Sequence, residues 1–243
     1  MRWIYIALPI FAFWFFGQMD KLGISIIQTD PQFLQDIGIT GADQNAKIGM
    51  LTFAFTIAYA LSNLFWGFII DRLGARKTAI LGVSVWTVTM VMAGLSTSYS
   101  VFMLSRILLG LGEGMMIPVC NKFISQWFSS RETGRAQASW LSGNYLGPAI
   151  GSVILSLIIA SFYWQFTFYF LALCNLLINI PMFIFLTRDT PEEHKGVSSE
   201  EIRYIRDEDL AVQQTETKEK NFAQDYRYWI VWFGMLVASF LFF

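Results

Sequence analysis

The sequence contains the charged stretch Gly67-Phe68-Ile69-Ile70-Asp71-Arg72-Leu73-Gly74-Ala75-Arg76-Lys77. Long apolar runs flank it on both sides, over 48–70 and 78–96. Gly74 permits a tight turn. Asp71 and the cations of this stretch can form ion pairs across an interface between helices. We therefore expect two long helices that are joined by a short charged loop and belong to a larger helical bundle.

Apolar runs also occupy most of the remaining sequence. A helix needs about 20 apolar residues to span a hydrocarbon core about 30 Å thick, and six runs of about that length lie between charged or turn-rich breaks. They cover Trp3–Gln28, Ile48–Ile70, Thr78–Ser96, Ser100–Phe128, Ala136–Ala160 and Gln165–Thr187. A seventh run, over 228–243, is shorter, and we expect the chain to end inside that helix. The pattern predicts an all-α membrane protein.

The composition agrees with this class and excludes others. Hydrophobic residues make up 55% of the chain and charged residues only 14%, whereas charged residues are about 25% of a soluble domain. The net charge of −1 offers no basic excess for nucleic acid. The only histidine, His194, and the separated Cys120 and Cys174 do not have the spacing of a metal cluster. We expect no metal, no cofactor and no enzymatic activity.

Lysines and arginines are distributed unequally between the loops. With the N-terminus in the cytoplasm, nearly all loop cations fall on that side and only Lys47 on the other, as the positive-inside rule requires. We expect a multi-pass protein of the cell membrane, divided into a helical bundle over 1–187, a cytoplasmic linker over 188–227 and a partial helix over 228–243. The linker segment 198–201 is typical of a capping box and predicts a short solvated helix.

Five charged residues lie within the predicted spans, where each costs several kcal/mol unless it is paired or hydrated. Arg106 and Glu113 are seven residues apart and so share one helical face, about 20° from each other. By helical rise, Asp20 lies level with Arg106, and Asp20 is followed by Lys21. These four charges sum to zero and predict a cavity between the first and fourth spans, with a purely structural ion-pair network as the alternative. Lys122 lies nearer the membrane surface and can reach the cytoplasm.

The stretch 67–77 matches the pattern G-x-x-x-D-R-x-G-x-R-K and resembles the signature loop between helices two and three of the major facilitator superfamily. The matching residues are Gly67, Asp71, Arg72, Gly74, Arg76 and Lys77. The resemblance implies a fold of twelve helices in two halves, of which this chain would hold the N-terminal half and the start of helix seven. The missing C-terminal half would then be its partner in the bilayer.

Within that superfamily, the chain is similar to the anion:cation symporter family, which includes sugar-acid carriers and sialins. Asp20-Lys21 stands where the family has an Asp-Arg pair, and 106–113 matches its helix-four pattern R-x-x-x-G-x-x-E. The segments 125–128, 142–144 and 195–206 also agree with the family. Lysine in place of the family's arginine lacks the planar fork that binds a carboxylate with two hydrogen bonds.

The resemblance implies a role for each site residue. Lys21 would hold the carboxylate of a small organic anion, with Tyr59 and Asn144 as polar contacts. An aromatic residue in a helix interface and an interhelical hydrogen bond are the alternatives for these two positions. Asp20 and Glu113 would carry protons, and Arg106 would modulate them.

The implied function is secondary active transport of an organic anion, by proton-coupled symport with alternating access. The glycines and proline over 134–151 also resemble a motif of antiporters in the superfamily, although such spacing equally permits close helix packing. A non-transporting structural or regulatory membrane subunit is the alternative from another class.

Overall fold

The computed structural model describes residues 1–215, 226, 229, 230 and 233. Its elements are η1 (Trp3–Ala7), α1 (Leu8–Ile27), α2 (Pro31–Ile37), α3 (Gln44–Leu73), α4 (Ala75–Gly94), α5 (Tyr99–Glu113), α6 (Met116–Trp127), α7 (Thr133–Ser161), α8 (Gln165–Cys174), η2 (Asn175–Asn179), α9 (Ile180–Phe185), η3 (Pro191–Glu193) and α10 (Ser199–Thr215). Here η1 and η2 are π-helical turns, and η3 is a 3₁₀ turn. No strand occurs within the described residues. The partial seventh span expected over 228–243 lies almost wholly outside them.

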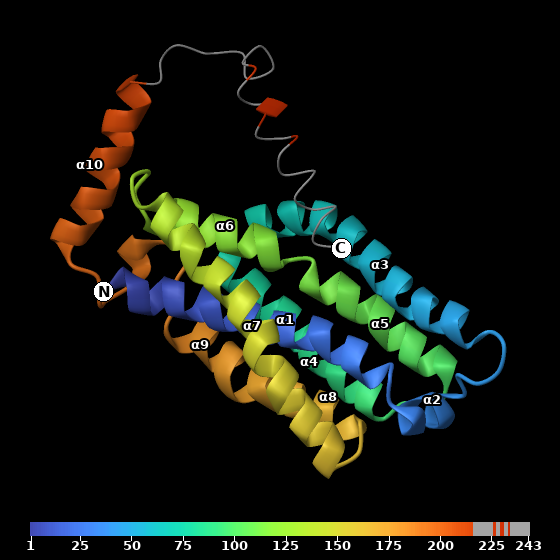
Figure 1. The fold of residues 1–243 in the computed structure, drawn as a ribbon. Helices are drawn as coiled ribbons and strands as arrows, with labels where there is room; N and C mark the ends of the chain where they lie inside the picture. The colour runs from blue at the N-terminus through green and yellow to red at the C-terminus, as the bar shows by residue number, and fades with distance from the viewer. Residues whose placement is uncertain (216–225, 227–228, 231–232, 234–243) are drawn as a thin grey trace.

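Six helical units are long and apolar enough to cross a membrane, and they agree within a few residues with the six predicted spans. They extend over Trp3–Ile27, Gln44–Leu73, Ala75–Gly94, Tyr99–Trp127, Thr133–Ser161 and Gln165–Phe185. They pack side by side, and α10 lies outside them (Figure 1). A further short helix, α2, was not expected. It begins after Asp30, whose side chain accepts a hydrogen bond from the backbone N–H of Gln32 (3.0 Å).

The fourth span is not continuous, contrary to the expectation of a single helix over 100–128. A turn at Gly114 and Met115 separates α5 from α6. Pro118 has no N–H to donate to the carbonyl of Gly114, and glycine is a poor helix former. A Cβ on Gly114 would also overlap the side chain of Ser62 on α3. The break therefore lets α3 pack closely against the middle of the span.

Glycines of α7 let its backbone pack closely against α1. A Cβ on Gly143 would lie 2.5 Å from the carbonyl oxygen of Phe11, and one on Gly147 would overlap the backbone of Phe15. Close packing thus accounts for these two positions of the glycine pattern, whereas a Cβ on Gly134 would meet no atom within 4 Å.

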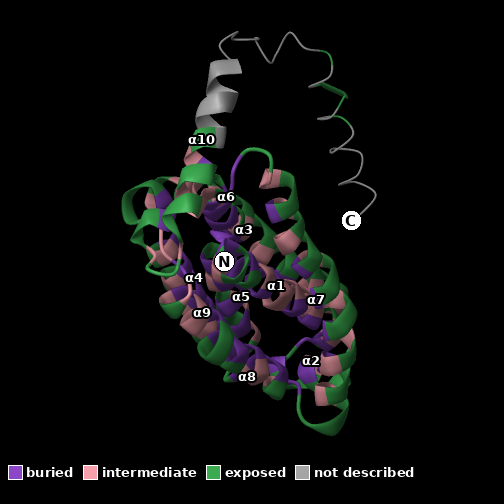
Figure 2. Cartoon of the chain, turned by 90° about the vertical axis from the view of Figure 1, so that its left-hand side faces the viewer, coloured by how far each residue is buried: buried purple, intermediate pink, exposed green. Residues whose placement is uncertain are grey.

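Buried aromatic residues fill the interior, including Trp86, Trp127 and Trp164. Figure 2 shows buried residues gathered between the helices and exposed ones along the outer surfaces. The spans α3 and α7 are the least buried, and they carry exposed apolar side chains such as Phe68 and Leu157. An apolar exterior of this kind suits lipid or a further helical unit and does not suit water.

The bundle has two ends, which we name by what they carry. The linker end holds the N-terminus, the α3–α4 and α6–α7 connections and the segment after α9. The distal end holds α2 and the α4–α5 and α7–α8 connections (Figure 1). At the distal end, Trp164 donates a hydrogen bond to Asp36 of α2 (2.9 Å). At the linker end, Trp127 donates to the carbonyl of Arg188 (3.0 Å).

Candidate functional site

Two helices place four charges together in the interior of the bundle. α1 supplies Asp20 and Lys21, and α5 supplies Arg106 and Glu113, which share one helical face. The Lys21 ammonium lies 3.3 Å from Glu113 Oε2, and Arg106 Nη1 lies 3.9 Å from Asp20 Oδ1. The expected meeting of the four charges is confirmed. The structure adds the choice of partners, since each helix contributes one cation and one anion to two ion pairs across the interface.

These ion pairs are incompletely hydrogen-bonded. Asp20 and Glu113 are 1% and 0% exposed, yet none of their four carboxylate oxygens has a hydrogen-bond partner within the described part of the chain. Arg106 Nε and Nη2 also have none there. Buried charged groups are ordinarily both paired and hydrogen-bonded, because desolvation is costly. The cluster therefore has unused hydrogen-bonding capacity for protons, water or a polar solute.

Aromatic rings surround the two cations. The Lys21 ammonium lies 4.7 Å from the ring centroid of Tyr59 on α3 and 5.7 Å from that of Trp14. The Arg106 guanidinium carbon lies 5.2 Å from both the Phe102 and the Phe168 rings. Both geometries are within the range of cation–π attraction. The rings hold the cations in place without using their N–H groups. The Lys21 ammonium also contacts Met116 Sδ at 4.0 Å, and Arg106 Nε and Nη2 stay available to an anion.

A cavity of about 290 Å³ lies beside the charges, between α1, α3 and α5. Its polar lining consists of Asp20, Lys21, Ser25, Thr52, Thr56 and Arg106. The volume suits a small solute of a few carbon atoms. The lining combines two cations with three hydroxyl groups, which can both donate and accept hydrogen bonds.

The two remaining predicted binding residues, Tyr59 and Asn144, differ in how they lie relative to the four charges. Tyr59 contacts Lys21 through its ring, and its role in binding stays a prediction. Asn144 lies on α7 and is half-buried, but no hydrogen bond in the described structure joins it to the four charges. Its binding role also stays a prediction. Lys122 extends to the linker end, where its ammonium lies 3.0 Å from Asp71.

The signature loop builds the tight connection between α3 and α4. Gly74 has φ +82° and ψ 165°, a conformation that side chains disfavour. A Cβ at this position would lie 2.7 Å from the Asp189 carboxyl group. Gly67, Arg72 and Lys77 do not take part in this packing: a Cβ on Gly67 would meet no atom within 4 Å, and the two cations are exposed.

Asp189 is a structural residue of this loop that the sequence analysis missed. Its carboxylate accepts a hydrogen bond from the backbone N–H of Arg76 (2.8 Å) in the first turn of α4, where a negative charge is stabilised by free N–H groups and the helix dipole. The Arg76 guanidinium in turn donates to the carbonyls of Phe183 (3.2 Å) and Ile184 (2.6 Å) at the end of α9. The signal in the sequence was an acidic residue just after the sixth span, but only the tertiary fold brings it to position 76.

Neither cysteine has the surroundings of a reactive group. Cys120 and Cys174 are buried free thiols, and Trp14 Nε1 donates to the Cys120 sulfur (3.1 Å). No group of three His, Cys, Asp or Glu side chains that could hold a metal ion occurs in the described ranges. The side chains of the central site can supply ion pairing, hydrogen bonding and proton transfer.

Several known proteins with similar sequences are named as transporters of organic anions. A family model described as "Major Facilitator Superfamily" matches residues 5–243. A hexuronate transporter of Bacillus subtilis is 29% identical over 187 residues, which are 76% of this chain and 43% of that protein. A probable sulfoacetate transporter of Cupriavidus necator is 27% identical over 192 residues, with 79% and 43% covered. A D-galactonate transporter of Escherichia coli is 26% identical over 189 residues, with 78% and 42% covered.

A solved structure confirms the fold. The crystal structure of a bacterial homologue of the human lysosomal transporter Spinster, in an inward-facing and unoccupied conformation, matches with a TM-score of 0.63 at 18% identity. The match covers 81% of this chain and 46% of that one. The chain thus spans less than half the length of the relatives it resembles. With the family model matching nearly all of its residues, the chain belongs to the major facilitator superfamily, as a multi-pass membrane protein whose six spans form an N-terminal helical bundle of that fold.

Proposed function

We propose that this chain forms the N-terminal half of a proton-coupled symporter for small organic anions, such as sugar acids, that works by alternating access. Residues 1–187 would be the transporting bundle, 188–227 the cytoplasmic linker and 228–243 the start of helix seven. The observation that carries the proposal is the ion pair between Lys21 and Glu113 beside a polar cavity. Because the Glu113 oxygens accept no hydrogen bond in the described structure, an anionic solute can take the place of Glu113 beside the Lys21 ammonium.

The first step of the proposal concerns the anion. Lys21 has an ammonium group with three donors, and Glu113 occupies only one side of it. A carboxylate that enters the cavity can replace Glu113 at the ammonium, while the hydroxyls of Thr52 and Thr56 can bind the hydroxyl groups of a sugar acid. The names of the relatives agree with this solute class, since hexuronate, sulfoacetate and galactonate are all small organic anions.

The second step concerns the proton. When Glu113 takes up a proton, its attraction for Lys21 falls and the ammonium becomes available to the anion. Asp20 and Arg106 form the second ion pair of the cluster. Asp20 also interacts electrostatically with Glu113. We infer that proton binding and anion binding favour each other in this way. Transport further needs a second half to close the site from the other side, since the relatives are more than twice as long as the matched region.

Proton-driven accumulation tests the proposal. The complete protein, with a C-terminal half like those of its relatives, would be reconstituted in vesicles with an imposed pH gradient. The parent should concentrate a labelled sugar acid, and Glu113→Gln should abolish accumulation while it keeps anion binding, because Gln mimics the protonated acid. Glu200→Gln, the same change at an exposed residue of the linker, is the matched control and should retain accumulation. If Glu113→Gln concentrates the anion at the parental rate, Glu113 does not couple protons to transport.

We further propose that the linker end faces the cytoplasm of a cell membrane. The two native thiols are buried. A single cysteine introduced into the chain can therefore be labelled in intact cells with little background from the native cysteines. An impermeant thiol reagent should label cysteines at Ser98 or Gln44, at the distal end, and should not label one at Ser199. Labelling at Ser199 from outside would reverse the orientation.

A further inference from the structure

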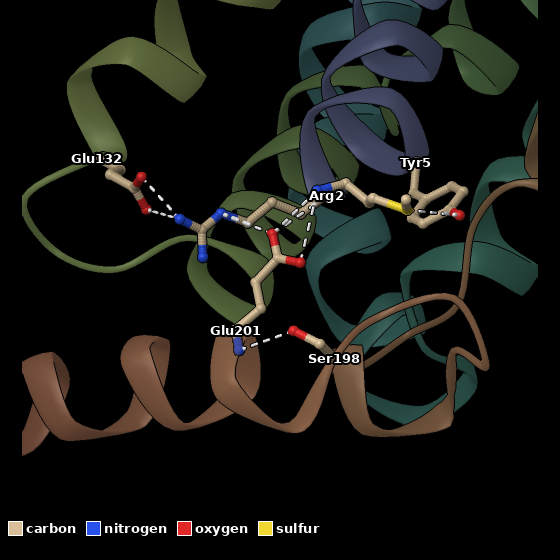
Figure 3. A network of polar contacts seen from close by, with 6 residues as sticks. Arg2, Tyr5, Glu132, Ser198 and Glu201 are labelled. Atoms are coloured by element: carbon tan, nitrogen blue, oxygen red, sulfur yellow. Dashed lines mark hydrogen bonds and ion pairs between the residues drawn. The ribbon is translucent and has the colours of Figure 1, made fainter.

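Arg2 is a buried arginine at the linker end that the central site does not use. Its side chain is only 7% exposed, although it lies one residue before the first helical turn, η1. Arg2 Nη2 donates to Glu132 (2.7 Å), which immediately precedes α7. On its other side, Arg2 Nε lies 3.7 Å from Glu201 of α10, whose carboxylate also accepts from the Arg2 backbone N–H (3.5 Å). Figure 3 shows the guanidinium between the two carboxylates.

These contacts join three segments that are far apart in the sequence. Glu132 is 130 residues from Arg2, and Glu201 is 199 residues from it. Two rings enclose the same guanidinium: Phe128 at the end of α6, with its centroid at 5.9 Å, and Tyr204 of α10 at 5.3 Å. We name the set Arg2, Glu132 and Glu201 the clasp.

Glu201 departs from its expected part in a capping box. Ser198 Oγ accepts a hydrogen bond from the Glu201 backbone N–H (3.2 Å), which is the first half of that motif. In the second half, the glutamate side chain would return to the backbone N–H of the capping residue. Here the carboxylate extends instead to Arg2 and to the Met1 amino group (3.2 Å). The glutamate thus contributes a contact with the bundle in place of a local one.

The side chains of α10 are described over residues 199–207, and few of them besides the clasp contact the bundle directly. Among these residues Ile205 is fully buried, and Tyr204 is 42% exposed. Arg206 forms its hydrogen bonds with Glu192 (2.9 and 3.0 Å), which belongs to the same linker segment. Burial alone would raise the pKa of Glu192, but a backbone hydrogen bond and the hydrogen bonds and charge of Arg206 together lower this pKa below its ordinary value. That pair ties α10 to the linker segment next to Asp189, which is itself bonded to α4.

We propose that the clasp is a reversible set of ion pairs that docks the linker helix α10 on the linker end of the bundle. Arg2 neutralises one glutamate from each side, so loss of the arginine removes both contacts and leaves Glu132 and Glu201 facing each other with like charges. When the clasp opens, α10 separates from the bundle while the six spans keep their packing. The inference concerns the linker and is independent of what the central site transports.

Limited proteolysis of the purified chain in detergent tests the clasp. Trypsin cuts after Arg203 and Arg206, which flank the buried Ile205, and a protease needs a detached and unwound segment. The cleavage rate at these two sites therefore reports the detached population of α10. Mass spectrometry would identify the products, and gel filtration would confirm that each variant is folded.

Two single substitutions should release the helix. Arg2→Gln and Glu201→Gln should each raise cleavage at Arg203 and Arg206 at least about fivefold, since each removes a charge-assisted contact. Glu200→Gln is the matched control for Glu201→Gln, because it removes the same charge from the same helical turn but has no ion pair among the described residues. Arg135→Gln is the matched control for Arg2→Gln, because Arg135 is an exposed arginine near the same end of the bundle.

The outcomes separate the clasp from its alternative. Both controls should cleave within about twofold of the parent, as expected for exposed charges. If Arg2→Gln does not fold, Glu201→Gln decides alone, because its side chain belongs to the linker. If Ile205→Ala accelerates cleavage while Glu201→Gln leaves the parental rate unchanged, the apolar contact alone docks α10 and the proposal is wrong.

Discussion

Arg76 is half-buried and Arg106 is buried, and the chain holds them in different ways. Arg76, at the linker end, donates to two backbone carbonyls at the end of α9, and its own backbone N–H donates to Asp189. Arg106, in the centre, has an ion pair at 3.9 Å and two aromatic rings, and its Nε and Nη2 lack hydrogen-bond partners in the described structure.

The difference separates a charge that fixes structure from charges that can change partners. The last carbonyls of a helix lack partners within the helix, and the Arg76 guanidinium satisfies two of them and so ties α4 to α9. In the central cluster, a proton can bind a carboxylate without breaking a hydrogen bond in the described structure, because the oxygens of Asp20 and Glu113 accept none there. The same contrast distinguishes Asp189, which is bonded to a helix N-terminus, from Glu113, whose oxygens accept no hydrogen bond in the described part of the chain.

The largest expected effect is on anion binding at the centre. Lys21→Gln removes the charge at similar side-chain length, so the affinity of the complete protein for a sugar acid should fall by about tenfold or more, given about 1.5–3 kcal/mol for a hydrogen bond to a charged group. Calorimetric titration in detergent measures it. Lys122→Gln, which removes a cation at the linker end, should leave the affinity unchanged. Equal losses in both variants would remove the distinction between the two regions.

A smaller effect, on stability, is expected in the signature loop. Gly74→Ala should lower the free energy of unfolding by about 1–3 kcal/mol, because the new Cβ is strained at this φ and ψ and meets the Asp189 carboxyl group. Thermal unfolding in detergent gives the comparison. Gly134→Ala is the control, since a Cβ there is unobstructed on a helix and should be neutral or slightly stabilising. A Gly74 variant as stable as the parent would show that the loop tolerates rearrangement.

The smallest effect is expected at Asp71. Its ion pair with Lys122 is solvated, with side chains 71% and 39% exposed, so Asp71→Asn should change stability by at most about 1 kcal/mol. The same unfolding measurement applies. A loss as large as that of Gly74→Ala would place Asp71 among the fixed charges of the linker end.

Local patterns predicted the parts of the structure that depend on one helix alone. Apolar length located the six spans, and helical register placed Arg106 and Glu113 on one face opposite Asp20 and Lys21. The turn between α5 and α6 was also encoded locally, by Gly114 and Pro118, but the apolar character of the whole span concealed it.

Contacts that depend on tertiary structure could not be predicted in this way. Asp189 meets Arg76 across more than a hundred residues, and Arg2 meets Glu201 across 199. Charged residues in loops have many accessible partners, and only the packing of the spans selects among them. The partners of Asn144 depend in the same way on the packing around α7, which its own sequence does not encode.

The dependence of anion affinity on pH tests most directly whether Lys21 exchanges its partner Glu113 for an anion. The groups around Glu113 are Asp20 and Lys21 on α1, Tyr59 on α3 and Arg106 on α5. Protonation of Glu113 frees Lys21, so the complete parent protein should bind a sugar acid more tightly as pH falls from about 8 to 5, a range in which the solute carboxylate stays ionised. In Glu113→Gln, Lys21 is free at every pH, and the affinity should be high and nearly constant. A Gln variant that keeps the parental dependence on pH would contradict the exchange of Lys21 between Glu113 and the anion.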